Sequence, residues 1–210
     1  YPEYRKYPKR YIREGHELEQ AALSNCDLAI YASEWAANTA RTQYDVDPKK
    51  VRVVPFGSNF SWEPTEDEVE RMVEQRRKSV CELLFLGVSW ERKGGDKALA
   101  TAALLHRRGV QVRLRVVGCE PPKGALPAFV EVHPFISKHT VLGQRKLAGM
   151  IGSSHFLLLP SEAECFGIVL SEASSFGVPC LANAIGGITT AVNEGRNGLL
   201  FAPKAPAEAW

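Results

Sequence analysis

A regular alternation of short apolar runs with helical patterns, from residue 83 onward, most constrains what this chain can fold into. Runs typical of buried strands cover 83–87, 112–118, 130–132, 155–159, 180–182 and 199–202. Helical patterns lie between them, at 95–108, at 142–153, from Phe166 onward and at 188–194. Strands that alternate with helices indicate a parallel sheet with helices on both faces, so we predict a doubly wound α/β fold. Ligands of such folds bind at the carboxyl ends of the strands.

The first 80 residues contain fewer such units. We expect a helix at 14–25, a strand at 27–32, a helix that follows a Ser33 cap and runs to about Tyr44, and a strand at 51–55. Thr65 and Glu68 have the spacing of a capping box before a charged surface helix at 66–78. Residues 1–13, which contain two prolines, are expected to be irregular.

Residues 160–179, with the sequence PSEAECFGIVLSEASSFGVP, predict an acidic loop and then a helix between two of the expected strands. Gly177 and Pro179 are typical of a helix end. The first N–H groups of a helix have no partner within it, and they favour anions, above all phosphate. We therefore expect an anion site where this helix begins.

Two glutamates flank the expected anion site. Glu164 lies just before the helix and Glu172 lies inside it, which separates their backbones by roughly 10 Å along the helix axis. Carboxylates accept hydrogen bonds from sugar hydroxyls, so this spacing suits a ligand with hydroxyls at both ends and a diphosphate in the middle. A nucleotide-sugar has this layout. Equally, Glu164 could only complement the helix dipole while Glu172 faces solvent.

The same stretch resembles the acid-pair motif of the retaining glycosyltransferases of family 4, also called group 1. In that family the motif is E-G-F-G-x-x-x-x-E-A, followed by a small-residue stretch and G-x-P. Here Glu164, Phe166-Gly167 and Glu172-Ala173 match the motif, and Cys165 replaces its first glycine. The resemblance covers 81–203 well and 14–60 more loosely.

This resemblance implies a GT-B enzyme, in which two Rossmann-like domains face each other. Residues 81–210 would form the C-terminal domain that binds the nucleotide-sugar, and 61–80 would form a linker helix. Residues 1–60 would be the end of the N-terminal, acceptor-side domain. The remainder of that domain would be this chain's partner in the cleft.

The resemblance also implies roles for the site residues. Glu164 would be catalytic and hold the hydroxyls of the donor sugar, and Glu172 would bind the ribose. Lys93 matches the phosphate-binding lysine of the family's K-G pair, whereas Val88 stands where the family has a phosphate-binding arginine. Arg92 could take the place of that arginine. The remaining donor-binding residues surround the helix N-terminus: Phe166, Gly167, Ile168 and Val169.

The activity implied by the resemblance is retaining transfer of a sugar, a hexose in the first instance, from a nucleotide-diphosphate sugar to a glycan, lipid or small-molecule acceptor. The family generally works without a metal ion, and no cofactor is expected. Two alternatives stay open: a nucleotide-sugar epimerase on the same fold, and a non-catalytic module that binds a nucleotide-sugar. The base, the sugar and the acceptor stay open too, and a chain with half of the cleft could be inactive alone.

The composition favours a reducing, cytoplasmic location. The five cysteines form no C-x-x-C pair, which argues against a zinc site or a disulfide framework. We see no signal peptide and no apolar run long enough to span a bilayer. A formal net charge of +2 gives no reason to expect a nucleic-acid partner. A basic cluster in the first 13 residues could contact anionic lipid as a peripheral membrane contact or be a solvated loop; it comprises Arg5, Lys6, Lys9, Arg10 and Arg13.

Overall fold

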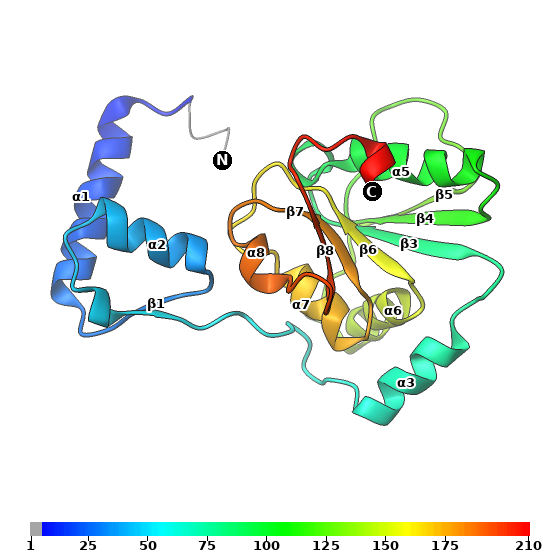
Figure 1. Ribbon diagram of the computed structural model, residues 1–210, viewed down its shortest axis with the longest axis horizontal. Coiled ribbons are helices and arrows are strands. Elements are labelled where there is room, and N and C mark those ends of the chain that lie inside the picture. Colours follow the sequence, from blue (N-terminus) through cyan, green and yellow to red (C-terminus); the bar gives the residue numbers. More distant parts are fainter. Residues whose placement is uncertain (1–5) are drawn as a thin grey trace.

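The computed structural model describes residues 6–210, which form a small N-terminal part and a larger part joined by an extended segment at 54–65 (Figure 1). The N-terminal part pairs two parallel strands and flanks them with two helices. Its elements are α1 (Lys9–Asn25), β1 (Ala29–Tyr31), α2 (Glu34–Gln43) and β2 (Val51–Val53). Helix α3 (Glu66–Gln75) then leads into the larger part.

The larger part is built on a six-stranded sheet in the order β5-β4-β3-β6-β7-β8, in which every neighbouring pair is parallel. Its strands are β3 (Cys81–Leu86), β4 (Val112–Val117), β5 (Val130–His133), β6 (Phe156–Leu159), β7 (Cys180–Asn183) and β8 (Gly198–Phe201). The chain first runs outward from β3 to β5, and it then returns to place β6 on the other side of β3. The predicted doubly wound fold is confirmed, and the order of strands reverses between β3 and β6, where such folds bind ligands.

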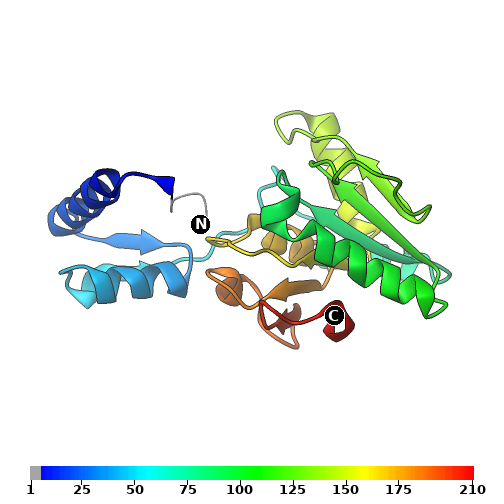
Figure 2. The same ribbon diagram turned by 90° about the horizontal axis from the view of Figure 1, so that it is seen from above.

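Helices cover both faces of this sheet (Figure 2). Helix α5 (Gly95–Arg107) lies on one face, and α6 (Val141–Gly152) and α7 (Ile168–Ser175) lie on the other. Alternate residues of β3 serve the two cores: Leu83 and Phe85 pack on the α5 side, and Leu84 packs on the side of α6 and α7. Near-continuous apolar strands are expected in a sheet that is buried on both faces.

Three of the predicted helices differ in length from the structure. Helix α1 begins at Lys9, so the expectation of an irregular segment through residue 13 is wrong for 9–13. Pro8 precedes the first turn, where a missing N–H is tolerated, and Arg13 forms an i,i+4 ion pair with Glu17 at 3.5 Å. The described part of the basic cluster therefore lies mostly on this exposed helix, while Arg5 falls outside the described residues.

Helix α3 begins at the predicted capping box of Thr65 and Glu68 but ends at Gln75, three residues early. Arg76 adopts an extended conformation there, and its guanidinium donates to the carbonyl oxygens of Gly152, Phe176 and Gly177 at 3.0–3.1 Å. These bonds tie the end of α3 to the larger part.

The short helix α8 (Ile188–Ala191) also ends three residues before its predicted bound. Val192 is extended, and the side chain of Asn197 accepts a hydrogen bond from the Asn193 N–H at 2.7 Å. This turn takes the chain directly into β8.

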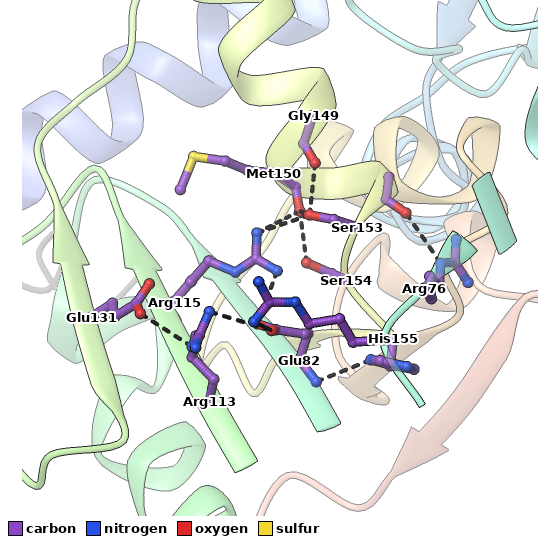
Figure 3. A network of polar contacts seen from close by, with 12 residues as sticks. Arg76, Glu82, Arg113, Arg115, Glu131, Gly149, Met150, Ser153, Ser154 and His155 are labelled. Atoms are coloured by element: carbon purple, nitrogen blue, oxygen red, sulfur yellow. Dashed lines mark hydrogen bonds and ion pairs between the residues drawn. The ribbon is translucent and has the colours of Figure 1, made fainter. Parts of the chain in front are cut away.

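A buried polar network fills the space between the amino half of the sheet and α6 (Figure 3). Glu82 is 2% exposed, and its carboxylate lies 3.0 Å from Arg115, 3.5 Å from Arg113 and 3.9 Å from Arg77. Arg115 also donates to Ser153 Oγ at 2.9 Å. The network fixes α6 to the strands at the edge of the sheet opposite the carboxyl ends.

The extended segment 54–65 packs against α7 and α6, from Phe166 at the start of α7 to Phe176 just after its end. Ser171 Oγ on α7 donates to the Phe56 carbonyl at 2.9 Å, and the Phe56 ring meets Phe166 edge-on with 5.4 Å between centroids. Farther along, the Ser61 N–H and Oγ both donate to Gln144 Oε1 on α6, at 3.1 and 2.6 Å. The segment is thereby anchored to both helices that cover this face of the sheet.

None of the helices within residues 6–210 is long and apolar enough to cross a bilayer. The same residues contain no cluster of three or more His, Cys, Asp or Glu that could hold a metal ion. The five cysteines, all within these described residues, are thiols rather than members of disulfide bonds.

Candidate functional site

A cavity of about 820 Å³ opens at the carboxyl ends of β3 and β4, beside the N-terminus of α7. It is lined by the loops after β3 and β5, by the loop after β6 on the other half of the sheet, and by the extended segment. The cavity therefore lies at the point where the order of strands reverses, as expected for this fold. All eight residues that the sequence predicts for the site line it: Arg92, Lys93, Glu164, Phe166, Gly167, Ile168, Val169 and Glu172.

Glu164 is held by a lysine from the neighbouring loop. Its side chain is 10% exposed, and one carboxylate oxygen forms an ion pair with Lys93 Nζ. Arg92 Nη1 lies 3.7 Å from the same oxygen and donates to the Ala163 carbonyl at 3.3 Å. Two cations thus converge on one carboxylate, which places Glu164 and Lys93 together at one wall of the cavity.

The glycines around Lys93 allow this close approach. Lys93 ends the short helix α4 (Trp90–Lys93), which the sequence does not predict as a separate element, and Gly94 follows with φ +79°. A Cβ on Gly94 would lie 2.1 Å from the Pro160 carbonyl oxygen, so no larger residue fits between the two loops. On the other side, the Lys93 stem packs against Gly87, where a Cβ would come within 2.9 Å of it.

The N-terminus of α7 opens into the cavity. Gly167 precedes the helix with φ +82°, and no side chain caps this end of the eight-residue helix. The first N–H groups of α7 therefore have neither an intrahelical partner nor a side-chain partner. An anion of the size of a phosphate is the group that such an end favours.

Glu172 lies one helical turn farther along α7 and is 2% exposed. Its carboxylate forms an ion pair with Lys138 Nζ, from the loop between β5 and α6. Lys138 is absent from the predicted set, although its loop follows the carboxyl end of a strand and was expected near the ligand crevice. A solvated Glu172, the alternative that the sequence left open, is contradicted by this burial.

Four other cavity residues come from the extended segment, namely Phe56, Asn59, Phe60 and Ser61. No spacing pattern in the sequence predicts this, because the segment lies between β2 and α3, outside the strands and helices that build the sheet. Phe56 is 53% exposed at the cavity wall, and Val88, which takes the position of the family's arginine, is 65% exposed. The wall that would carry that arginine is therefore apolar in this chain.

The glycine-rich turn at 183–187 serves the architecture of the loop rather than the cavity. Gly187 N–H donates to the Glu164 carbonyl at 3.2 Å, and a Cβ on Gly187 would lie 1.8 Å from the Cys165 carbonyl oxygen. Asn183 Nδ2 donates to the buried Ser161 carbonyl at 3.0 Å. This turn supports the backbone of the acidic loop from behind, so the position of Glu164 depends on it.

Comparison with known proteins agrees with the resemblance found in the sequence. Residues 81–210 match the family model described as glycosyl transferases group 1. The chain is 27% identical over 209 residues to a D-inositol 3-phosphate glycosyltransferase of Nocardioides sp., covering 90% of this chain and 46% of that protein. It is 30% identical over 205 residues to the protein of the same name from Streptomyces scabiei, covering 88% and 46%. The chain thus spans less than half the length of these relatives.

Solved structures share the fold. A sucrose-phosphate synthase from Thermosynechococcus elongatus aligns with a TM-score of 0.68 at 25% identity, over 92% of this chain and 49% of the synthase. The Anabaena protein HepE, in complex with UDP-glucose, aligns with a TM-score of 0.68 at 18% identity, over 100% of this chain and 57% of HepE. At that identity the second likeness shows the fold alone.

Proposed function

Because the chain belongs to the group 1 family of glycosyltransferases and has the GT-B type of sheet, we propose that its cavity binds a nucleoside diphosphate sugar. The protein would transfer the sugar to an acceptor with retention of anomeric configuration. The observation that carries the proposal is the arrangement of Glu164 and Glu172 in one cavity, on either side of the open N-terminus of α7. This arrangement matches the order of groups in the donor: sugar, diphosphate and ribose.

In the proposed complex, the diphosphate lies at the N-terminus of α7. The N–H groups of Ile168 and Val169 and the ammonium group of Lys93 would contact its oxygens. Negative charge grows on this diphosphate as the bond to the sugar breaks. Preorganised donors of this kind stabilise such charge and supply the electrostatic part of catalysis without a metal ion.

The two glutamates would bind the hydroxyl groups at the two ends of the donor. Glu164 forms an ion pair through Oε2, which leaves Oε1 as an acceptor for hydroxyls of the sugar. Glu172 would bind the ribose hydroxyls in the same way. Because its proposed contact is to the sugar, Glu164 would also orient the sugar for attack by the acceptor. Retention itself is taken from the family resemblance.

Direct titration of this chain tests the donor site. We expect one of UDP, GDP or ADP to bind in calorimetry, and Glu172→Gln to weaken that binding roughly 10- to 100-fold, because a hydrogen bond to a charged group contributes about 1.5–3 kcal/mol. Glu162→Gln is the matched control, since Glu162 lies on the same acidic loop but is exposed and does not line the cavity.

Two results would count against the proposal. One is binding that Glu172→Gln leaves unchanged. The other is a protein extended to the length of its relatives that binds none of the three nucleotides. In that longer protein, Glu164→Gln should lower the rate of sugar transfer more than it lowers nucleotide affinity, because its proposed contact is to the sugar.

A further inference from the structure

We propose that Lys138 is the positioning residue for ribose recognition, acting by holding Glu172 in the orientation that accepts the ribose hydroxyls. The inference rests on the proposed function of the cavity and goes beyond it. Lys138 lies 34 residues before Glu172 and outside the acid-pair motif.

Glu172 needs a cation because of where it lies. It is 2% exposed, between the buried residues Leu170 and Ala173 of α7, and a buried carboxylate is costly unless it is paired. The structure records one ion pair for Glu172, and its partner is Lys138. The pair uses Oε1, so Oε2 remains as the acceptor for a ligand.

Lys138 is held in place on its own side as well. Gln144 Nε2 donates to the Lys138 carbonyl at 2.8 Å, and the other end of the same amide accepts two hydrogen bonds from Ser61. The next turn is closed by Gly143, where a Cβ would lie 1.9 Å from the Ser137 carbonyl oxygen. The loop that carries Lys138 is thereby fixed to α6 and to the extended segment.

The ammonium group is also directed by an aromatic ring. Lys138 Nζ lies 5.6 Å from the ring centroid of Phe60, within the range of a cation–π contact. Its side chain is 26% exposed, so it reaches the buried carboxylate from the cavity side. The ammonium group thus contacts both the Glu172 carboxylate and the Phe60 ring, and the two contacts together restrict the rotamers of Lys138.

The consequence is specific for the ribose. A carboxylate with one oxygen fixed by an ammonium group presents its second oxygen at a defined place, whereas a carboxylate without that partner can turn or be solvated differently. Loss of Lys138 should therefore reduce the ability of the site to distinguish a ribonucleotide from a deoxyribonucleotide. It should do so without a comparable loss of contacts to the diphosphate or base.

The test measures this discrimination by calorimetry with a nucleoside diphosphate that the wild type binds and with its 2′-deoxy and 3′-deoxy forms. We expect the wild type to bind the ribonucleotide at least 10-fold more tightly than one deoxy form. In Lys138→Met this ratio should fall to about 3-fold or less, as in Glu172→Gln, and in Lys138→Arg it should be largely restored. Lys138→Gln serves as the second variant if Lys138→Met does not fold.

Each contrary outcome has its own meaning. If Lys138→Met weakens all ligands equally and keeps the ratio, Lys138 is only structural and the inference is overturned. The matching nucleoside is titrated as well. If Lys138→Met lowers the affinity for the nucleoside diphosphate but changes neither the affinity for the nucleoside nor the ratio, Lys138 binds phosphate and the inference is again overturned. A wild type that binds but does not discriminate also overturns it. A protein extended to the length of its relatives that binds no nucleotide at all contradicts the proposed function itself.

Discussion

Replacing Glu82 should destabilise the fold far more than replacing any exposed acid near it. Glu82 is 2% exposed and is surrounded by three arginines, of which Arg115, at 3.0 Å, is itself only 11% exposed. Glu82→Gln keeps the shape of the side chain and removes its charge. The Arg115 guanidinium then keeps its hydrogen bonds to Ser153 and to the Met150 carbonyl but loses its counter-ion.

The expected cost follows from this burial. Breaking a buried ion pair by removing one partner typically costs 3–5 kcal/mol, because the remaining charge is left uncompensated. Arg113 remains compensated when Glu82 loses its charge, since it keeps its ion pair with Glu131 at 3.1 Å, but this pair does nothing for Arg115. We therefore expect Glu82→Gln to lower the free energy of unfolding by about 3–5 kcal/mol.

Urea unfolding followed by tryptophan fluorescence measures this change, and the slope of the unfolding free energy against urea concentration is expected to stay the same. Glu131→Gln is the matched control, because the Glu131 side chain is 43% exposed and its pair with Arg113 should contribute about 0–1 kcal/mol. The double replacement of Glu82 by Leu and Arg115 by Met should recover most of the loss, because both charges are then removed together. A Glu82→Gln variant within about 1 kcal/mol of Glu131→Gln would refute the reasoning.

Two further predictions use the cysteines. Cys165 is exposed and lines the cavity, so N-ethylmaleimide should modify it before the buried Cys180, and a bound nucleotide-sugar should slow that modification. Mass spectrometry measures the rate of modification, with Cys165→Ser as the control, and equal rates with and without ligand would contradict the prediction. Burial raises the pKa of Cys180 to about 12, so the stability that its neutral thiol contributes is present below the pKa of the unfolded chain, near 9, and is lost as the pH rises toward 12. Between pH 8 and 10, Cys180→Ala should lose about 1 kcal/mol less unfolding free energy than the wild type, and equal losses would contradict the assignment.

The parallel sheet is predictable because its signal is local and repeated. The strands are short runs rich in apolar residues, and helices follow β3, β5, β6 and β7, so the structure matches the expected strands to within two residues at each end. The amphipathic alternation in β4, where Arg113 and Arg115 separate Val112, Leu114 and Val116, also marks a strand with one polar face. Which residue that polar face would meet is a tertiary fact, so the partnership with Glu82 could not be read from the sequence.

The candidate site is predictable only where a short motif contains its residues, and the K-G pair at Lys93 and the acid-pair motif are the two such motifs. Glu164, Gly167 and Glu172 lie within nine residues, and folding the motif into a loop and a helix is enough to bring them together. Lys138 and Phe60 reach the same cavity from distant segments. Their positions depend on the order of strands and on the path of the extended segment, and neither has a sequence signature.

The glycines in α6 show that local helix propensity, too, is a limited guide to the structure. Gly143, Gly149 and Gly152 lower the intrinsic helix propensity, yet the helix forms over 12 residues. Two of the three occupy close approaches: a Cβ on Gly143 would lie 1.9 Å from the Ser137 carbonyl oxygen, and one on Gly152 would lie 3.1 Å from Met72 Sδ. Tertiary packing therefore outweighs propensity here, and the same packing positions the loop that carries Lys138.

The charges of the cavity suit the proposed donor, which is anionic at its diphosphate and rich in hydroxyls at both ends. Its described lining contains three cations, Arg92, Lys93 and Lys138, and two carboxylates, Glu164 and Glu172, and each carboxylate is paired. The carboxylates are therefore compensated before any donor binds, and their free oxygens remain available to hydroxyls. The diphosphate would add negative charge where the N-terminus of α7 has no other partner. In the proposed complex, the sugar and the ribose thus contact carboxylates that are already paired with cations, and the diphosphate is itself the partner of the N-terminus of α7.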